Sequence, residues 1–138
     1  MTSPLELIGL RESFSTLEKE YQENPSFLPG IAHLKVKYSS FQRITGDGNC
    51  FYRAYWFGLL QHVHHNENAY ASLHAFLKSS QEYLIAQAYP AVSIEMFYDS
   101  TMDFIETLHS LSLEDIHQEM STGDETEYMV TFLKLFLR

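Results

Sequence analysis

A single cysteine lies where a glycine-rich loop gives way to an apolar segment. The loop is Gly46-Asp47-Gly48-Asn49, and Cys50 follows it directly. If Cys50 opens a helix, the unpaired N–H groups and the partial positive charge there favour its thiolate form. The glycines let the backbone approach a substrate closely, and successive N–H groups of the loop can bind a developing oxyanion. The pattern therefore predicts nucleophilic attack by Cys50 on an amide or thioester carbonyl.

The same residues also have a simpler interpretation. Free cysteine is among the most buried residue types, and most lone cysteines are inert parts of a core. A loop flanked by glycines can equally be a plain turn. The residues alone leave both interpretations of Cys50 open.

The elements that must position this loop are predicted to be mostly helical. Leu and Met together outnumber Val and Ile by two to one, which favours helices over strands. Between Ala91 and Arg138 there is no proline and a single glycine, Gly123, far fewer breaks than a β-sandwich needs. From Cys50 to about His65 nearly every side of the predicted helix is apolar, which is typical of a buried central helix.

Hydrophobic spacing predicts the other elements. Residues 41–45 are expected to be extended, and Ser112 with Asp115 indicates a capping box before another helix. Gly123-Asp124 is expected to break the chain before a last helix over 128–137. Further helices are expected over 68–88 and from 93 to about 108, and an N-terminal helix is expected from the apolar stripe of Leu7, Leu10, Phe14, Leu17 and Tyr21.

Residues 46–54, with the sequence GDGNCFYRA, resemble the cysteine motif of the ovarian-tumour (OTU) superfamily of deubiquitinases, and the otubain branch, peptidase family C65, in particular. Segments 17–21, 31–38 and 41–43, and more weakly 128–135, also resemble otubains. The resemblance implies a papain-like α+β cysteine protease fold. Because the chain is mostly α, we expect its helical half, with most of the central sheet missing. Residues 1–138 are expected to form a single otubain-like domain, apparently truncated at its C-terminus.

The resemblance also implies a function, which is isopeptidase activity that cleaves ubiquitin from proteins or from chains. The implied partners are ubiquitin or polyubiquitin, and no cofactor is implied. Cys50 would be the nucleophile, and Asp47 would be the second catalytic residue. The implied oxyanion-hole loop comprises Asp47, Gly48, Asn49 and Cys50, and the implied structural supports are Tyr21, Phe51 and Arg53.

Such an enzyme needs a histidine that takes the thiol proton and later gives it to the leaving amine. None of the seven histidines lies in a Gly-His-Tyr-Asp-like context of the kind that otubains carry. In the helix that Cys50 begins, His62 would be about 18 Å away along the axis. The alternative function is therefore a catalytically inactive half-domain that binds ubiquitin or a partner. The histidines are His33, His62, His64, His65, His74, His109 and His117.

A metal site is not expected. His62 and His65 are three residues apart, and Glu67 is close to them, but no Cys-x-x-Cys or His-Glu-x-x-His pattern supports zinc. Histidines near a helix end are usually solvated and complement the helix dipole. The acidic run is interpreted as a solvated face made of Glu114, Asp115, Glu119, Asp124, Glu125 and Glu127.

Composition excludes several other functions. The 138 residues carry a net charge of -9, which argues against a nonspecific nucleic-acid binder and against docking on an anionic membrane. No apolar run is long enough to span a bilayer, no signal peptide is recognisable, and one cysteine allows no internal disulfide. We expect a protein of the cytoplasm or also of the nucleus. The apolar segment 128–137 would cover more than one helix face, so self-association through it is expected.

Overall fold

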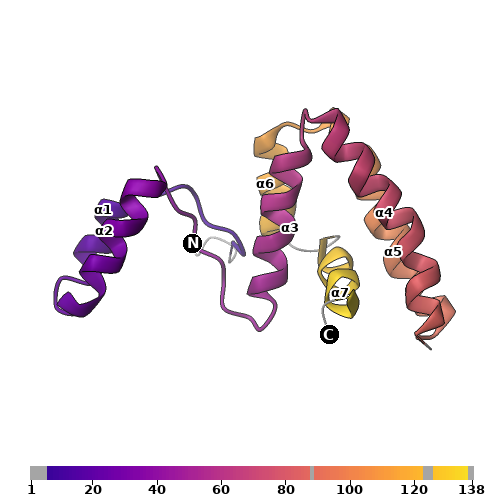
Figure 1. The fold of residues 1–138 in the computed structure, drawn as a ribbon, viewed down its shortest axis with the longest axis horizontal. Coiled ribbons are helices and arrows are strands. Elements are labelled where there is room, and N and C mark those ends of the chain that lie inside the picture. The colour runs from indigo at the N-terminus through magenta and orange to yellow at the C-terminus, as the bar shows by residue number, and fades with distance from the viewer. Residues whose placement is uncertain (1–5, 88, 123–125, 137–138) are drawn as a thin grey trace, which may run out of the picture. The chain divides into compact units, whose positions relative to one another are not determined.

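The computed structural model describes residues 6–87, 89–122 and 126–136. These residues form two compact units, one of residues Ile8–Ile44 and the other of the described residues before and after that segment. Figure 1 shows the helices of both units in chain order.

The unit of residues 8–44 consists of a pair of short helices and two extended segments that pair with each other. The helices are α1 (Phe14–Glu20) and α2 (Leu28–Lys37), joined through a 3₁₀ turn at Pro25–Phe27. Arg43 forms ion pairs with both Glu12 and Glu20, each at 2.8 Å. This places the extended segment 41–43 against the start and the end of α1.

The predicted N-terminal helix is wrong in its first half, because α1 begins only at Phe14. Ser13 caps it by accepting a hydrogen bond from the Ser15 N–H at 3.2 Å. Residues before the cap are extended and pair with the segment ahead of the glycine loop, with Gly9 N–H donating to Arg43 O and Glu12 N–H donating to Phe41 O, both at 2.8 Å. Pairing across the chain therefore overrides the helical spacing. The extended conformation predicted for 41–45 is confirmed.

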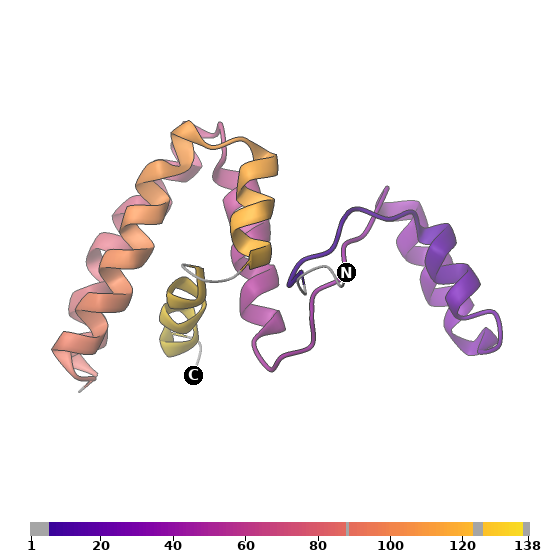
Figure 2. The ribbon, with the colours of Figure 1, turned by 180° about the vertical axis from the view of Figure 1, so that it is seen from behind.

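The second unit is a bundle of helices, and the prediction of a mostly helical chain is confirmed. In both views α7 lies between α3 and the antiparallel pair of α4 and α5 (Figures 1 and 2), and it packs on α3 and α5. Among the described residues no named strand occurs, and no helix there is long and apolar enough to cross a membrane. The elements are α3 (Cys50–Val63), α4 (Glu67–Ala86), α5 (Ala91–Thr107), a 3₁₀ turn (Leu108–Ser110), α6 (Leu113–Thr122) and α7 (Thr126–Phe136).

The core of this bundle forms around one face of α3. Trp56 is 2% exposed, and its Nε1–H donates to the Met129 carbonyl oxygen of α7 at 2.8 Å, so its one polar atom is satisfied inside the core. The expectation that α3 is buried on every side is wrong, since Phe51 and Tyr55 are 62% and 52% exposed. Further fully buried apolar residues of this unit are Leu60, Leu84, Ile94, Ile105, Leu108, Ile116, Met120, Met129 and Phe132.

Two helix starts show how local sequence sets the element bounds. The capping box before α6 is confirmed, because the Asp115 N–H donates to Ser112 Oγ at 3.1 Å while the Ser112 N–H donates to Asp115 Oδ2 at 3.0 Å. The start of α4 is capped by Asn66, which accepts a hydrogen bond from Ala69 N–H at 3.1 Å. The predicted break at Gly123-Asp124 and residue Leu137 of the last segment lie outside the described residues.

Candidate active site

Residues 46–49, here named the Cys50 loop, make a tight turn whose shape depends on Gly48. Gly48 has φ +86°, a left-handed conformation that residues with a side chain rarely adopt. A β-carbon at this position would meet no atom within 4 Å, so the backbone conformation and not the space requires glycine. The Asp47 N–H donates to the Thr45 carbonyl oxygen at 3.0 Å, and α3 begins immediately after the loop.

The carboxylate of Asp47 holds the loop in this shape. Its Oδ1 accepts a hydrogen bond from the Asn49 N–H at 3.0 Å, and its Oδ2 accepts one from Arg53 Nη1 at 2.8 Å. Partial burial disfavours the ionised carboxylate, but the Asn49 hydrogen bond and the Arg53 charge outweigh it and lower the pKa of Asp47. The ionised Asp47 carboxylate thus uses one oxygen on the Asn49 N–H and the other on Arg53, which suits it to shaping the loop.

Arg53 connects the Cys50 loop to α7 through a buried cation. Its side chain is 1% exposed and lies between the carboxylates of Asp47 and Glu127, which Nη1 and Nη2 bind respectively. A guanidinium with so little access to water needs counter-charges, and these two carboxylates supply them. Glu127, interpreted above as part of a solvated acidic face, is 45% exposed in its side chain and in addition pairs with the buried Arg53.

Cys50 is the first residue of α3 and is half-buried, so it is neither enclosed in the core nor freely exposed. The hydrogen bond from the Arg53 N–H to the Asn49 carbonyl oxygen, at 3.0 Å, is the first of the helix. The N–H groups of residues 50–52 precede it, where a helix has donors without intrahelical partners. A thiol and a set of backbone donors thus lie at one helix terminus, as acyl transfer through a thioester requires.

None of the hydrogen bonds among the described residues joins a histidine to Cys50. His62 is in the last turn of α3, about 18 Å from Cys50 along the helix axis. His33 is on α2 of the other unit. Four of the other histidines contact other parts of the chain. His64 lies on the Leu111 carbonyl oxygen at 2.6 Å, and His74 lies on Glu106 at 3.4 Å. His109 packs against the Tyr70 ring, and His117 packs against the Phe57 ring.

The histidines that raised the question of a metal are not gathered into a site. No group of three His, Cys, Asp or Glu side chains that could hold a metal ion occurs in the described part of the chain. His65 follows the end of α3 with φ 59°, and its ring lies against that of His64 at 3.9 Å between centroids. The arrangement is that of a helix end and its turn.

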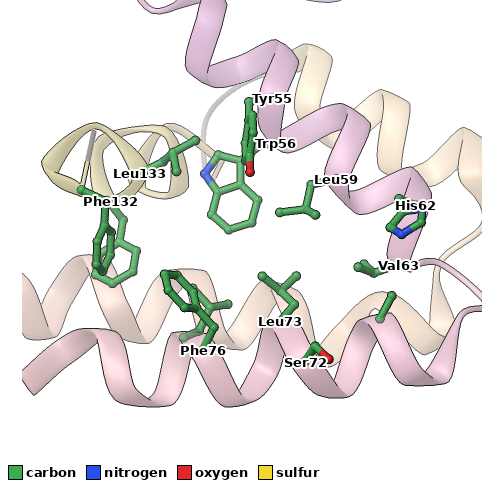
Figure 3. Close-up of a pocket in the computed structure, with 13 residues that line it drawn as sticks. Tyr55, Trp56, Leu59, His62, Val63, Ser72, Leu73, Phe76, Phe132 and Leu133 are labelled. Carbon is green, nitrogen blue, oxygen red and sulfur yellow. The ribbon is translucent and has the colours of Figure 1, made fainter. Parts of the chain in front are cut away.

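An apolar groove lies in the same unit, between α3, α4 and α7 (Figure 3). It encloses about 420 Å³. Phe76 of α4 is 57% exposed there, and Phe136 of α7 packs against it at 5.7 Å between ring centroids. Its polar members are Tyr55, His62 and Ser72, and its apolar lining includes Trp56, Leu59, Val63, Leu73, Phe76, Phe132, Leu133 and Phe136. Part of the apolar surface of the last helix therefore faces this groove, and self-association through it stays a prediction.

The structure brings two residues to the Cys50 loop that the sequence analysis missed. Glu127 reaches Arg53 across 74 positions of sequence, and Lys134 Nζ donates to Asn49 Oδ1 at 3.2 Å across 85 positions. No local pattern marks either residue, because their partners are far away in the chain. Tyr21, in contrast, packs against Phe27 within its own unit, with ring centroids 5.1 Å apart. The acidic residues Asp124 and Glu125 lie outside the described residues.

The sequence of this chain is similar to those of known proteins. Ubiquitin thioesterase OTUB1 of Homo sapiens is 31% identical over 131 residues, covering 94% of this chain and 48% of that protein. Ubiquitin thioesterase otubain-like of Caenorhabditis elegans is 29% identical over 136 residues, covering 94% of this chain and 47% of that protein. The chain therefore spans about half the length of the curated relatives it matches.

The solved structure of a ceOTUB1 ubiquitin aldehyde UBC13~Ub complex superposes on this chain with a TM-score of 0.87 and 26% identity, covering 94% of this chain and 54% of that one. The half that is shared is helical, which confirms the expected helical half of the OTU fold. The family model of Peptidase C65 Otubain matches residues 2–138. The chain belongs to the otubain family of C65 peptidases.

Proposed function

We propose that this chain carries the nucleophile of an otubain-like cysteine deubiquitinase, an isopeptidase that releases ubiquitin from proteins or from ubiquitin chains. The observation that carries the proposal is the setting of Cys50. Its half-buried thiol opens α3 directly after a loop held by Asp47 and Gly48, in a member of the C65 family.

The proposed chemistry is acyl transfer through a thioester. The Cys50 thiolate attacks the carbonyl carbon of the isopeptide bond, and the carbonyl oxygen becomes an oxyanion. The N–H groups of Asp47 and Asn49 already donate within the loop, so those of Gly48 and Cys50 are the backbone donors that stabilise this charge. Collapse of the intermediate breaks the C–N bond, and the lysine amine leaves with a proton from a general acid. Water then attacks the thioester carbonyl and releases the ubiquitin carboxylate and the thiol.

Turnover by this route needs a general base at Cys50, and the described residues place no histidine in hydrogen-bonding contact with it. Losing one member of a catalytic triad typically costs several orders of magnitude in rate. This observation favours a second candidate function, a catalytically inactive half-domain that binds ubiquitin or a partner protein. The two candidates share Cys50 and its loop and differ in whether a base is supplied.

We propose ubiquitin or polyubiquitin as the partner in both cases. Relatives are named ubiquitin thioesterases, and the matched structures are complexes with ubiquitin aldehyde and UBC13~Ub or UBCH5B~Ub. The net charge of -9 complements the basic surface that ubiquitin presents.

The test combines a binding measurement with a turnover measurement. Isotope-labelled ubiquitin is titrated with the native chain and with Cys50→Ala, and cleavage of ubiquitin dimers is followed for both. An enzyme gives turnover that Cys50→Ala abolishes, whereas a binding half-domain gives equal ubiquitin shifts for both chains and no turnover. Absence of both binding and turnover would contradict the two candidate functions together.

A further inference from the structure

Helix α7 contacts the machinery around Cys50 at two polar points. At the first, the Glu127 carboxylate accepts a hydrogen bond from Arg53 Nη2, while Nη1 of the same guanidinium binds Asp47 at 2.8 Å. At the second, Lys134 Nζ donates to the side-chain oxygen of Asn49 at 3.2 Å. Both contacts end on the Cys50 loop, one of them through Arg53 and the other directly.

The two contacts come from one face of α7. Glu127 and Lys134 are seven residues apart, which is two turns of helix and places both side chains on the same stripe. The apolar residues Met129 and Phe132 are fully buried, and the Met129 carbonyl oxygen accepts the Trp56 indole hydrogen bond at 2.8 Å. The helix is thus anchored by its buried residues, and its polar stripe is held against the loop.

A loss of charge at Glu127 affects the Cys50 loop through Arg53, because the guanidinium is buried. The Arg53 side chain is 1% exposed, so bulk water cannot take the place of a lost carboxylate partner unless the side chain moves. If Glu127 loses its charge, Asp47 is the one counter-charge that the described residues still give the guanidinium. Asp47 is also the acceptor for the Asn49 N–H at 3.0 Å, so any shift of that carboxylate changes the backbone next to the thiol.

We propose that Glu127 and Lys134 are positioning residues that hold the Cys50 loop, and with it the backbone donors beside the thiol, in the conformation used for acyl transfer. The inference rests on the proposed role of Cys50 as the nucleophile. Neither residue makes a hydrogen bond to the thiol among the described residues. They act through Arg53, Asp47 and Asn49.

The test compares Glu127→Gln, Lys134→Gln and the double variant with two matched controls on α4. The controls are Glu82→Gln and Lys78→Gln, whose native side chains are exposed and make no hydrogen bond or ion pair among the described residues. Lys134→Arg serves as the conservative variant, because it keeps a cationic donor for Asn49. Amide exchange at Asn49, the rate of Cys50 alkylation by iodoacetamide across pH, and the thermal melt are measured for every variant.

We expect exchange at the Asn49 amide to accelerate about tenfold or more in Glu127→Gln, because the loss of one charge-assisted hydrogen bond raises local opening by that factor. The alkylation profile is expected to change in Glu127→Gln and Lys134→Gln, to change most in the double variant, and to stay as in the native chain in Lys134→Arg and both controls. A role confined to helix packing would lower the melt without moving these local measurements.

Exchange at Asn49 and alkylation of Cys50 that stay within about twofold of the native chain in the double variant would overturn the proposal. If Glu127→Gln does not stay folded, Lys134→Gln and Lys134→Arg decide it by the same two measurements. Neither measurement requires ubiquitin. Failure of the positioning role is therefore distinguishable from failure of the proposed function, which appears as absent ubiquitin binding and turnover in the native chain.

Discussion

The buried charge of Arg53 makes its two carboxylate partners a sensitive point of the fold. We consider the double substitution Asp47→Asn/Glu127→Gln, which keeps the shape of both side chains and removes both negative charges. Asp47 and Glu127 are 31% and 45% exposed in their side chains, whereas Arg53 is 1% exposed. The substituted groups are therefore easily hydrated, and the guanidinium is left in the interior without the two counter-charges that the described residues supply.

The magnitude follows from that asymmetry. Leaving an unpaired charge buried costs about 3–5 kcal/mol, and the amide oxygens of Asn and Gln still accept hydrogen bonds, so we expect the lower end, about 3 kcal/mol. For a chain of this length that corresponds to a melting temperature lowered by about 10 °C. Asp47→Asn alone leaves Glu127 in place, and we expect about half of that loss, near the value of one hydrogen bond to a charged group.

The assay is urea unfolding of the double variant, with Arg53→Met added as a third substitution. Methionine fills the space of the arginine stem and removes the buried charge, so we expect the triple variant to recover more than half of the lost free energy of unfolding. If the triple variant is as unstable as the double variant, the loss of free energy of unfolding does not come from the buried charge of Arg53, and the expectation is wrong.

The other unit offers a matched control for this experiment. Arg43 lies between Glu12 and Glu20 in the same two-carboxylate arrangement, but its side chain is 45% exposed. Exposed ion pairs contribute little to stability, so Glu12→Gln/Glu20→Gln is expected to change the free energy of unfolding far less. Equal losses in the two double variants would show that burial of Arg53 is not the cause.

Three further outcomes are expected. Ser112→Ala removes the cap of α6 and should lower the free energy of unfolding by about 1 kcal/mol in urea denaturation; no measurable change would show that the cap is dispensable. Because the pKa of Asp47 is lowered from its ordinary value of 3.8, its stabilising contribution is present above that pH and is lost as the pH falls through the folded-state pKa. The stability difference between the native chain and Asp47→Asn should therefore shrink in acid unfolding, and a constant difference would contradict this. The apolar groove should bind a hydrophobic dye, and Phe76→Ser/Leu133→Ser should reduce dye binding and self-association, whereas Val92→Ser, on a residue that is 81% exposed on α5, should not.

Local chemistry made part of the fold predictable from sequence. The start of α3 at Cys50, the capping box at Ser112 and the extended segment before the glycine loop depend on residues a few positions apart, and the structure has all three. The N-terminal helix was mispredicted because residues before Ser13 pair with a segment about thirty positions away, and hydrophobic spacing does not register such pairing.

The candidate site divides in the same way. Gly48 and Asp47 could be assigned to the loop because a left-handed turn and an Asx-type hydrogen bond are local features. Glu127 and Lys134 could not be assigned, since each meets its partner only after the helices pack. The burial of Arg53 could not be predicted either, because nearly every side of the helix that carries it is apolar in sequence.

The proposed function makes Cys50 a nucleophile directed at the C-terminus of ubiquitin. The most direct measurement is reaction of the native chain with ubiquitin that carries a thiol-reactive group in place of its C-terminal carboxylate, with the adduct mapped by mass spectrometry. We predict a single adduct on Cys50, suppressed by excess unmodified ubiquitin and absent in Cys50→Ala. If this reagent gives no adduct while iodoacetamide labels Cys50 readily, the proposed function is contradicted, because the thiol is then accessible but not directed at ubiquitin.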